Sequence, residues 1–204
     1  MNSHFVFVHG WGMAPEFWDG LIDCLPGIKT SRIDLGFIET SAFLENISDS
    51  AIYITHSLGT MWALKNHHAD MKALVSINGF SCFQNFTDER VLRAMKTRLK
   101  RDPKAQMEEF WKSYGLPSSQ NLNISTLQEG LEWLTSWDAR KELEALTCPV
   151  LSLAGQNDPL LTLPLMKEEW EGFDLHICED GNHALPLNNP QWCTDHIKEF
   201  LREL

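Results

Sequence analysis

Residues 51–60 of this chain read AIYITHSLGT, an apolar run that leads directly into a serine turn and a helix-forming segment. The run at 51–55 has the β-branched and aromatic composition of a strand that is buried on both faces. Ser57 and Leu58 follow it, and Gly59 supplies a small residue where the backbone must turn tightly. A strand, a turn at serine and a helix together lift a hydroxyl above the edge of a parallel sheet. The stretch therefore predicts an α/β domain in which Ser57 is a nucleophile.

Strand-like runs recur along the chain and alternate with helical patterns. The expected strands are residues 5–8, 30–33, 51–55, 74–77, 150–154 and 175–178. The expected helices between and after them are residues 15–24, 57–66, 160–170 and 190–204. This alternation predicts an open, mostly parallel sheet with helices on both faces.

Residues 80–140 interrupt the alternation, because they contain helical patterns at 91–99, 106–111 and 127–134 but no convincing strand. An insertion of this length is too long for a simple connection between two strands. We expect one domain over residues 1–204, with a core of 1–79 and 140–204 and a helical cap at about 80–139. Such a cap would cover the carboxyl edge of the sheet, where open α/β sheets bind ligands.

The composition narrows the class of protein. The 204 residues suit one domain, and the formal net charge of −11 argues against nucleic acid or an anionic membrane as a partner. No apolar run is long enough to span a bilayer, and residues 1–4 lack the features of a secretory signal, so we expect a cytoplasmic protein. The five cysteines form no CxxC pair, and we expect no metal and no cofactor.

Two polar side chains follow later strands at the same edge as Ser57. Asp158 comes after the strand at 150–154, and His183 comes after the strand at 175–178. A serine hydroxyl needs a base within hydrogen-bond reach, and an acid then fixes the tautomer of the imidazole. The loop HGWG at 9–12 follows the first strand, so we assign the oxyanion-binding N–H groups to Trp11 and Leu58.

Each of these residues also has a plain structural interpretation. Ser57 would serve as a helix N-cap, Asp158 as a turn former before Pro159, and His183 as an ordinary loop histidine. His56 flanks the nucleophile and is a candidate to line the same pocket. Several coincidences at strand ends, in a consistent order, favour catalysis over separate structural roles.

The same segments resemble the α/β-hydrolase superfamily, in which the triad follows the chain order Ser, Asp, His. Within it, the chain resembles the pimeloyl-ACP methyl ester carboxylesterases of biotin synthesis, through HGWGM at 9–13, Ser57-Leu58-Gly59, GLEWL at 130–134 and DAR at 138–140. The resemblance implies a Ser57–Asp158–His183 triad with Trp11 and Leu58 as the oxyanion hole. Thr55 and Thr60 stand where that family usually has glycine.

A basic segment bears on the partner. Residues 88–104 contain seven basic and three acidic side chains, so the segment is positive within a strongly negative chain. We single out four arginines as candidates to dock an acidic acyl carrier protein: Arg90, Arg93, Arg98 and Arg101. A solvated helix face is the alternative.

The sequence therefore predicts a serine carboxylesterase that takes a small acyl ester. The favoured substrate is the methyl ester of pimeloyl-ACP, which would give pimeloyl-ACP and methanol. Two alternatives stay open: a hydrolase of small free esters or thioesters, and a hydrolase fold that is catalytically silent and binds a ligand.

Overall fold

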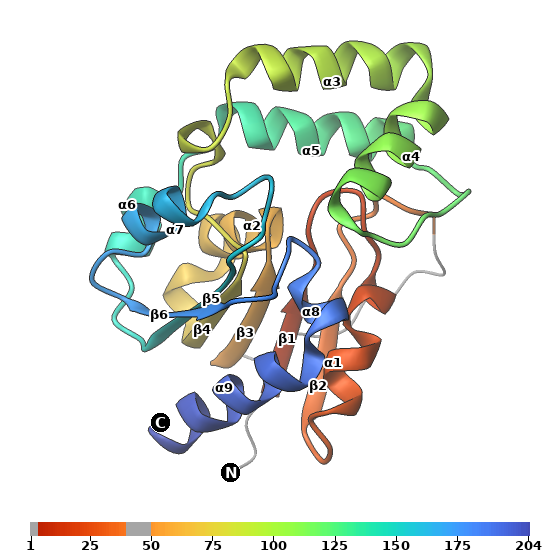
Figure 1. Cartoon of the computed structure of the whole chain (residues 1–204). Helices are drawn as coiled ribbons and strands as arrows, with labels where there is room; N and C mark the ends of the chain where they lie inside the picture. The colour runs from red at the N-terminus through yellow and green to blue at the C-terminus, as the bar shows by residue number, and fades with distance from the viewer. Residues whose placement is uncertain (1–3, 40–49) are drawn as a thin grey trace.

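The computed structural model describes residues 4–39 and 50–204, and it contains six strands in this part of the chain. Most of the N-terminal stretch used to predict the location, residues 1–3, lies outside the described residues. The strands are β1 (His4–Val8), β2 (Lys29–Ile33), β3 (Ala51–His56), β4 (Met71–Ile77), β5 (Val150–Gly155) and β6 (Asp174–Cys178). They form one sheet in the order β2-β1-β3-β4-β5-β6 (Figure 1), and all five neighbouring pairs are parallel.

The strands form where the sequence predicts them, and the predicted open, parallel sheet with helices is confirmed. The central strands are mostly apolar because helices cover both faces of a parallel sheet. Every residue of β1 and of β3 is buried. The outermost strands, β2 and β6, are more polar and only partly buried.

The helices outside the insertion match their predicted bounds less closely than the strands do. The predicted helices at 57–66 and 190–204 correspond to α2 (Leu58–His67) and α9 (Pro190–Arg202). The prediction of one continuous helix at 15–24 is wrong, because the chain forms a 3-10 turn, η1 (Pro15–Trp18), followed by the short α1 (Asp19–Asp23). The helix predicted at 160–170 begins later, as α7 (Leu163–Glu169). Its start is delayed because the Asp158 carboxylate accepts hydrogen bonds from the Leu160 and Leu161 N–H groups and holds them in a turn.

The chain between β4 and β5 contains a 3-10 turn and four helices. These are η3 (Phe83–Asn85), α3 (Glu89–Arg101), α4 (Pro103–Tyr114), α5 (Ile124–Ser136) and α6 (Arg140–Glu144). Figure 1 shows α3 and α5 lying along one another, with α4 beside them, away from the strands. Two further short helical segments complete the described chain, η2 (His68–Asp70) and α8 (Leu185–Asn188).

Local sequence signals set the ends of the inserted helices. The Asp88 and Asp102 carboxylates accept hydrogen bonds from N–H groups in the first turns of α3 and α4, and Asn123 does the same for α5. Pro103 begins α4, where its missing N–H costs nothing. Gly115 ends that helix with φ 65°, a conformation that favours glycine. None of the helices in the described residues is long and apolar enough to cross a membrane.

A chain of buried hydroxyls joins β3, α2 and β4 and includes the two threonines beside the serine turn, Thr55 and Thr60. Thr55 Oγ1 lies 2.7 Å from Thr60 Oγ1, which lies 3.0 Å from Ser76 Oγ. Thr55 also donates to the Val75 carbonyl at 3.2 Å, so each hydroxyl has a partner. A Cβ atom at Gly79 would lie 2.0 Å from Thr60 Oγ1, so a glycine there makes room for the threonine. The hydroxyls thus stabilise the strand and helix that carry Ser57.

We expect Thr60→Val to lower the free energy of unfolding by about 1–3 kcal/mol, because it leaves buried hydroxyls without a partner. Urea unfolding measures the change. Thr194→Val is the matched control, since Thr194 is also buried and its hydroxyl has no partner among the described residues. If both variants lose the same stability, the hydroxyl chain does not stabilise the turn.

Candidate active site

Ser57 lies in the turn between β3 and α2 in a conformation that L-residues rarely adopt. Its backbone angles are φ 53° and ψ −126°, and its N–H donates to the Ile77 carbonyl of the neighbouring strand at 3.2 Å. Ser57 occupies the N-cap position of α2, but its side chain makes no capping hydrogen bond to the helix. Strain of this kind persists where the surrounding structure enforces it, and it is typical of active sites.

Two glycines let the turn pack against the end of β1. A Cβ atom at Gly59 would lie 2.3 Å from the Val8 carbonyl oxygen, so helix α2 can sit this close only with glycine there. A Cβ atom at Gly10 would lie 3.0 Å from the Ser57 Cβ. The loop at 9–12 therefore touches Ser57, as the assignment of an oxyanion-binding loop requires.

The two residues predicted to bind the oxyanion are the chain neighbours of the residues in this contact: Trp11 follows Gly10, and Leu58 follows Ser57. Leu58 is buried and is the first residue of α2. Trp11 is buried, lines the same cavity as Ser57, and donates its indole N–H to the Leu127 carbonyl in α5 at 2.9 Å. The structure thus places both near Ser57; the role of their backbone N–H groups stays a prediction.

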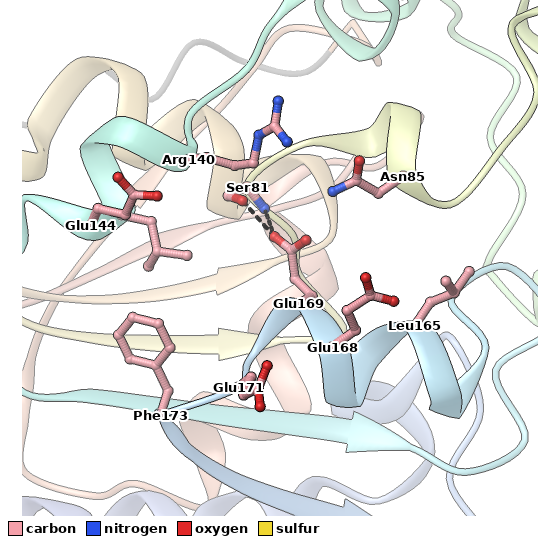
Figure 2. Close-up of a pocket in the computed structure, with 10 residues that line it drawn as sticks. Ser81, Asn85, Arg140, Glu144, Leu165, Glu168, Glu169, Glu171 and Phe173 are labelled. Atoms are coloured by element: carbon pink, nitrogen blue, oxygen red, sulfur yellow. Dashed lines mark hydrogen bonds between the residues drawn. The ribbon is translucent and has the colours of Figure 1, made fainter.

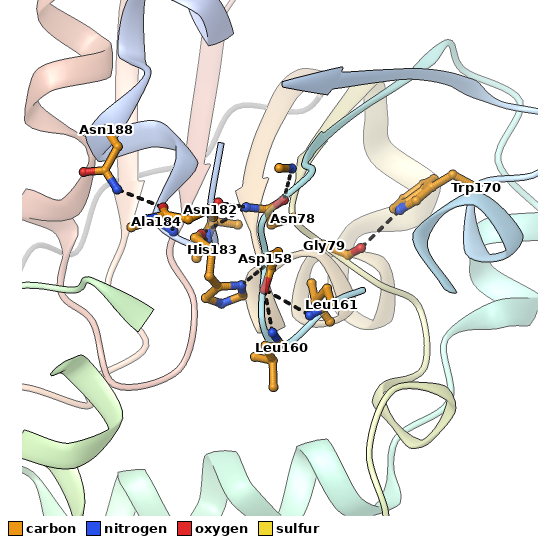
Figure 3. Close-up of polar contacts among 12 residues, drawn as sticks. Asn78, Gly79, Asp158, Leu160, Leu161, Trp170, Asn182, His183, Ala184 and Asn188 are labelled. Atoms are coloured by element: carbon orange, nitrogen blue, oxygen red, sulfur yellow. Dashed lines mark hydrogen bonds and ion pairs between the residues drawn. The ribbon is translucent and has the colours of Figure 1, made fainter. Parts of the chain in front are cut away.

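Asp158 and His183 form a buried pair, with their side chains 1% exposed each. The His183 Nδ1–H donates to Asp158 Oδ2 at 2.7 Å. Asp158 Oδ1 accepts from the Leu160 and Leu161 N–H groups at 2.8 and 3.0 Å, so this carboxylate shapes a turn and binds the imidazole at once (Figure 3). A proton held on Nδ1 leaves Nε2 of the neutral ring free to accept another.

The loops that carry the acid and the base are in direct contact. The Asn157 N–H donates to the Gly181 carbonyl at 2.8 Å, and a Cβ atom at Gly155 would lie 2.7 Å from that same oxygen. Any larger residue at 155 would push the two loops apart. The spacing between Asp158 and His183 is therefore set by backbone contact.

The structure adds three residues that the sequence argument missed or misplaced. His56 is fully buried and absent from the cavity lining, because its ring packs against the His183 ring with centroids 4.9 Å apart. Asn78 follows β4 directly and contacts both the acid and the base loops. Tyr114, at the end of α4, places its ring 5.5 Å from that of His183. The position of Asn78 after a predicted strand was a signal that could have found it.

A narrow cavity of about 40 Å³, room for a few water molecules, borders Ser57. Its walls come from the loop after β1, the turn at Ser57, the segment between β4 and α3, the helices α3, α4 and α5, and the loop after β5. They are Trp11, Ser57, Phe80, Phe83, Thr87, Val91, Leu92, Met95, Phe110, Tyr114, Leu134 and Leu160. The lining is almost wholly apolar and uncharged, which suits a hydrocarbon chain.

A larger hollow of about 500 Å³ lies elsewhere, between α6, α7 and η3 (Figure 2). Its lining includes Arg140 and four glutamates, one of which, Glu169, accepts hydrogen bonds from the Ser81 N–H and hydroxyl. It contains none of the predicted triad. Within the described parts of the chain, no group of three or more His, Cys, Asp or Glu side chains could hold a metal ion.

The four arginines proposed for docking lie on α3, and three of them have acidic partners. Arg90 pairs with Asp88, Arg93 with Glu89, and Arg98 with Glu109 of α4. Arg101 is exposed, and among the residues that the structure describes no ion pair is formed by it. The pair across to α4 makes this face less positive than the count along α3 indicates.

Comparison with known proteins places the chain in a family. The sequence profile of the Alpha/beta hydrolase family matches residues 5–196. The chain belongs to this family. A pimeloyl-[acyl-carrier protein] methyl ester esterase from Citrobacter koseri is 24% identical over 230 residues, which cover 93% of this chain and 90% of that protein. The expected resemblance is thereby confirmed.

Solved structures agree on the fold of this α/β-hydrolase. A bromoperoxidase from Bacillus anthracis superposes with a TM-score of 0.81 at 16% identity, over 99% of this chain and 92% of that one. A thermophilic esterase from Thermogutta terrifontis gives 0.79 at 16% identity, over 98% and 90%. Membership in the hydrolase family, together with the methyl ester esterase from Citrobacter koseri, supports the predicted enzyme class, a carboxylic ester hydrolase.

The strain at Ser57 has a measurable consequence. We expect Ser57→Gly to be more stable than Ser57→Ala by about 1 kcal/mol, because glycine adopts positive φ without the Cβ penalty. Thermal unfolding of the two variants gives the difference. Equal stability, or a more stable alanine variant, would show that the turn is not strained.

Proposed function

We propose that this α/β-hydrolase is a serine carboxylesterase in which Ser57 is the nucleophile, His183 the base and Asp158 the acid that orients the base. The observation that supports it best is the buried Asp158–His183 hydrogen bond, which lies at the same edge of the sheet as a strained serine whose hydroxyl does not cap its helix. A serine with a structural role alone requires neither the strained backbone nor the Asp158–His183 pair. This argument favours an active enzyme over a silent ligand-binding relative.

The reaction follows from the roles of these residues. Nε2 of His183 takes the Ser57 proton as the serine oxygen attacks the ester carbonyl carbon, and the charge passes to the carbonyl oxygen. The Trp11 and Leu58 backbone N–H groups hold that oxyanion. The carbonyl reforms, and the alcohol departs with the proton from His183. Water, deprotonated by His183, then attacks the acyl-enzyme, and the acid product leaves as Ser57 recovers its proton.

The helical insertion supplies the acyl-binding surface in this proposal. We treat residues 80–139 as a cap on a core made of 1–79 and 140–204. Side chains of α3, α4 and α5 face Ser57 across the apolar cavity. The cavity is narrow, so an acyl chain enters only if flexible side chains such as Met95 move aside.

The methyl ester of pimeloyl-ACP is the substrate that we favour, with pimeloyl-ACP and methanol as products, a reaction of biotin biosynthesis that would take place in the cytoplasm. The relative from Citrobacter koseri and the basic residues of α3 support it. The uncharged cavity lining suits a chain whose two ends are both esterified. A hydrolase of small free esters or thioesters is the second candidate, favoured by the ion pairs that occupy most of the arginines.

We expect Ser57→Ala to abolish hydrolysis of a short p-nitrophenyl ester, by at least 10³-fold in kcat, while the protein stays folded. A fluorophosphonate probe should label the wild type at Ser57 and leave the variant unlabelled. Circular dichroism checks the fold. Equal turnover by the two proteins would show that Ser57 is not the nucleophile, and no turnover by either would support the silent relative.

Docking of a carrier protein is tested by charge reversal on α3. We expect glutamate at positions 90, 93, 98 and 101 to lower kcat/KM for a carrier-bound ester at least tenfold and to leave a short free ester within twofold. The matched control reverses four exposed basic residues on other elements: Lys29, Lys141, Lys167 and Arg202. Equal losses on both substrates, or the same loss in the control, would contradict docking.

A further inference from the structure

The backbone carbonyl of His183 accepts hydrogen bonds from two side chains, one at the end of β3 and one directly after β4. His56 Nε2, at the end of β3, lies 2.8 Å from this oxygen. Asn78 Nδ2, just after β4, lies 3.0 Å from it (Figure 3). A carbonyl oxygen has two lone pairs, so both can be used at once. The two side chains thus hold the residue that we propose as the base through its backbone carbonyl group.

Asn78 connects the base loop to the acid loop. Its Nδ2 also donates to the Asn182 carbonyl at 2.8 Å, and its Oδ1 accepts from the Gly155 N–H at 2.8 Å. These partners fix the orientation of the amide, because two carbonyls require donors and one N–H requires an acceptor. The residue is fully buried and has φ 43°, which asparagine tolerates better than most side chains.

Among the described residues, the His56 side chain has one hydrogen-bond partner, the His183 carbonyl. Its Nε2 must carry the proton in order to donate, so its Nδ1 is an acceptor, and this atom is buried with no partner among the described residues. Burial and the neighbouring His183 lower the pKa of His56 well below its usual range, so the ring stays neutral. An unpaired buried nitrogen costs stability. An apolar ring would fill the space without that cost, so the donor is what the histidine adds.

We propose that His56 and Asn78 are positioning residues for His183: their N–H groups converge on its carbonyl oxygen and hold its imidazole between Asp158 and Ser57. The inference rests on the proposed role of His183 as base. Fixing the peptide plane of His183 fixes the direction of its Cα–Cβ bond, and with it the position of the ring. A displacement of the ring by about 1 Å is enough to cost on the order of 10²-fold in rate.

The experiment compares variants that keep or remove each donor, on a short p-nitrophenyl ester. His56→Phe keeps a ring and removes the N–H, and we expect kcat to fall at least tenfold with KM within twofold. His56→Gln returns an N–H donor close to the original Nε2, and we expect its kcat to be within threefold of the wild type. A role in packing alone predicts the opposite order, because phenylalanine fills the space better than glutamine.

Asn78→Asp keeps the side-chain shape and the acceptor for the Gly155 N–H but replaces the two donated hydrogen bonds with carboxylate oxygen. We expect kcat to fall at least tenfold with KM little changed. The double variant with His56→Phe should lose less than the product of the two single losses, since both donors act on one oxygen. Should Asn78→Asp fail to fold, the two His56 variants decide the matter alone.

His4→Phe is the matched control, because His4 is also buried and its Nε2 lies 2.7 Å from Ser31 Oγ, away from the triad. We expect its kcat to stay within twofold. The proposal is overturned if folded His56→Phe and Asn78→Asp keep kcat within threefold of the wild type, or if His56→Gln is as slow as His56→Phe. Full activity in Ser57→Ala would overturn the proposed function instead, so the two failures are distinguishable.

Discussion

The parallel direction of all six strands is the constraint from which the site follows. In a parallel sheet every strand ends at the same edge, so residues that directly follow different strands become neighbours. The loop at 9–12 follows β1, Ser57 follows β3, Asn78 follows β4, and Asp158 and His183 follow β5 and β6. Reversing any one of these strands would carry its loop to the far edge of the sheet.

Much of this arrangement could be predicted from the sequence, because it depends on local signals. Buried strands require apolar runs, and those runs were readable at the four central strands; the two edge strands, β2 and β6, were also predicted although they are more polar and only partly buried. The predicted site residues follow the ends of these strands, so the direction of the chain puts them at the carboxyl edge of the sheet. Ser57, Asp158 and His183 were predicted as site residues in this way, and so was Trp11 in the loop after the first strand; the structure places all four after strands of the sheet.

The rest depends on contacts between segments that are distant in the sequence. Nothing near Thr60 shows that its hydroxyl bonds to Ser76, or that Gly79 leaves room for it. The charge of α3 was misjudged for the same reason: Glu109 and Glu132 come from other helices and neutralise Arg98 and Lys96. A count along one helix does not include partners that the fold brings to it.

Two tryptophans cross between the loop after β1 and the helical insertion. Trp11 of the loop donates to the Leu127 carbonyl in α5, and Trp111 of α4 donates to the Gly12 carbonyl in the loop, at 2.7 Å. Gly130 permits this approach, since a Cβ atom there would lie 2.6 Å from the Trp11 ring. The insertion is therefore not an exchangeable module. A relative that acquires different inserted helices must change the loop with them, so in the proposed enzyme acyl preference and oxyanion geometry would be inherited together.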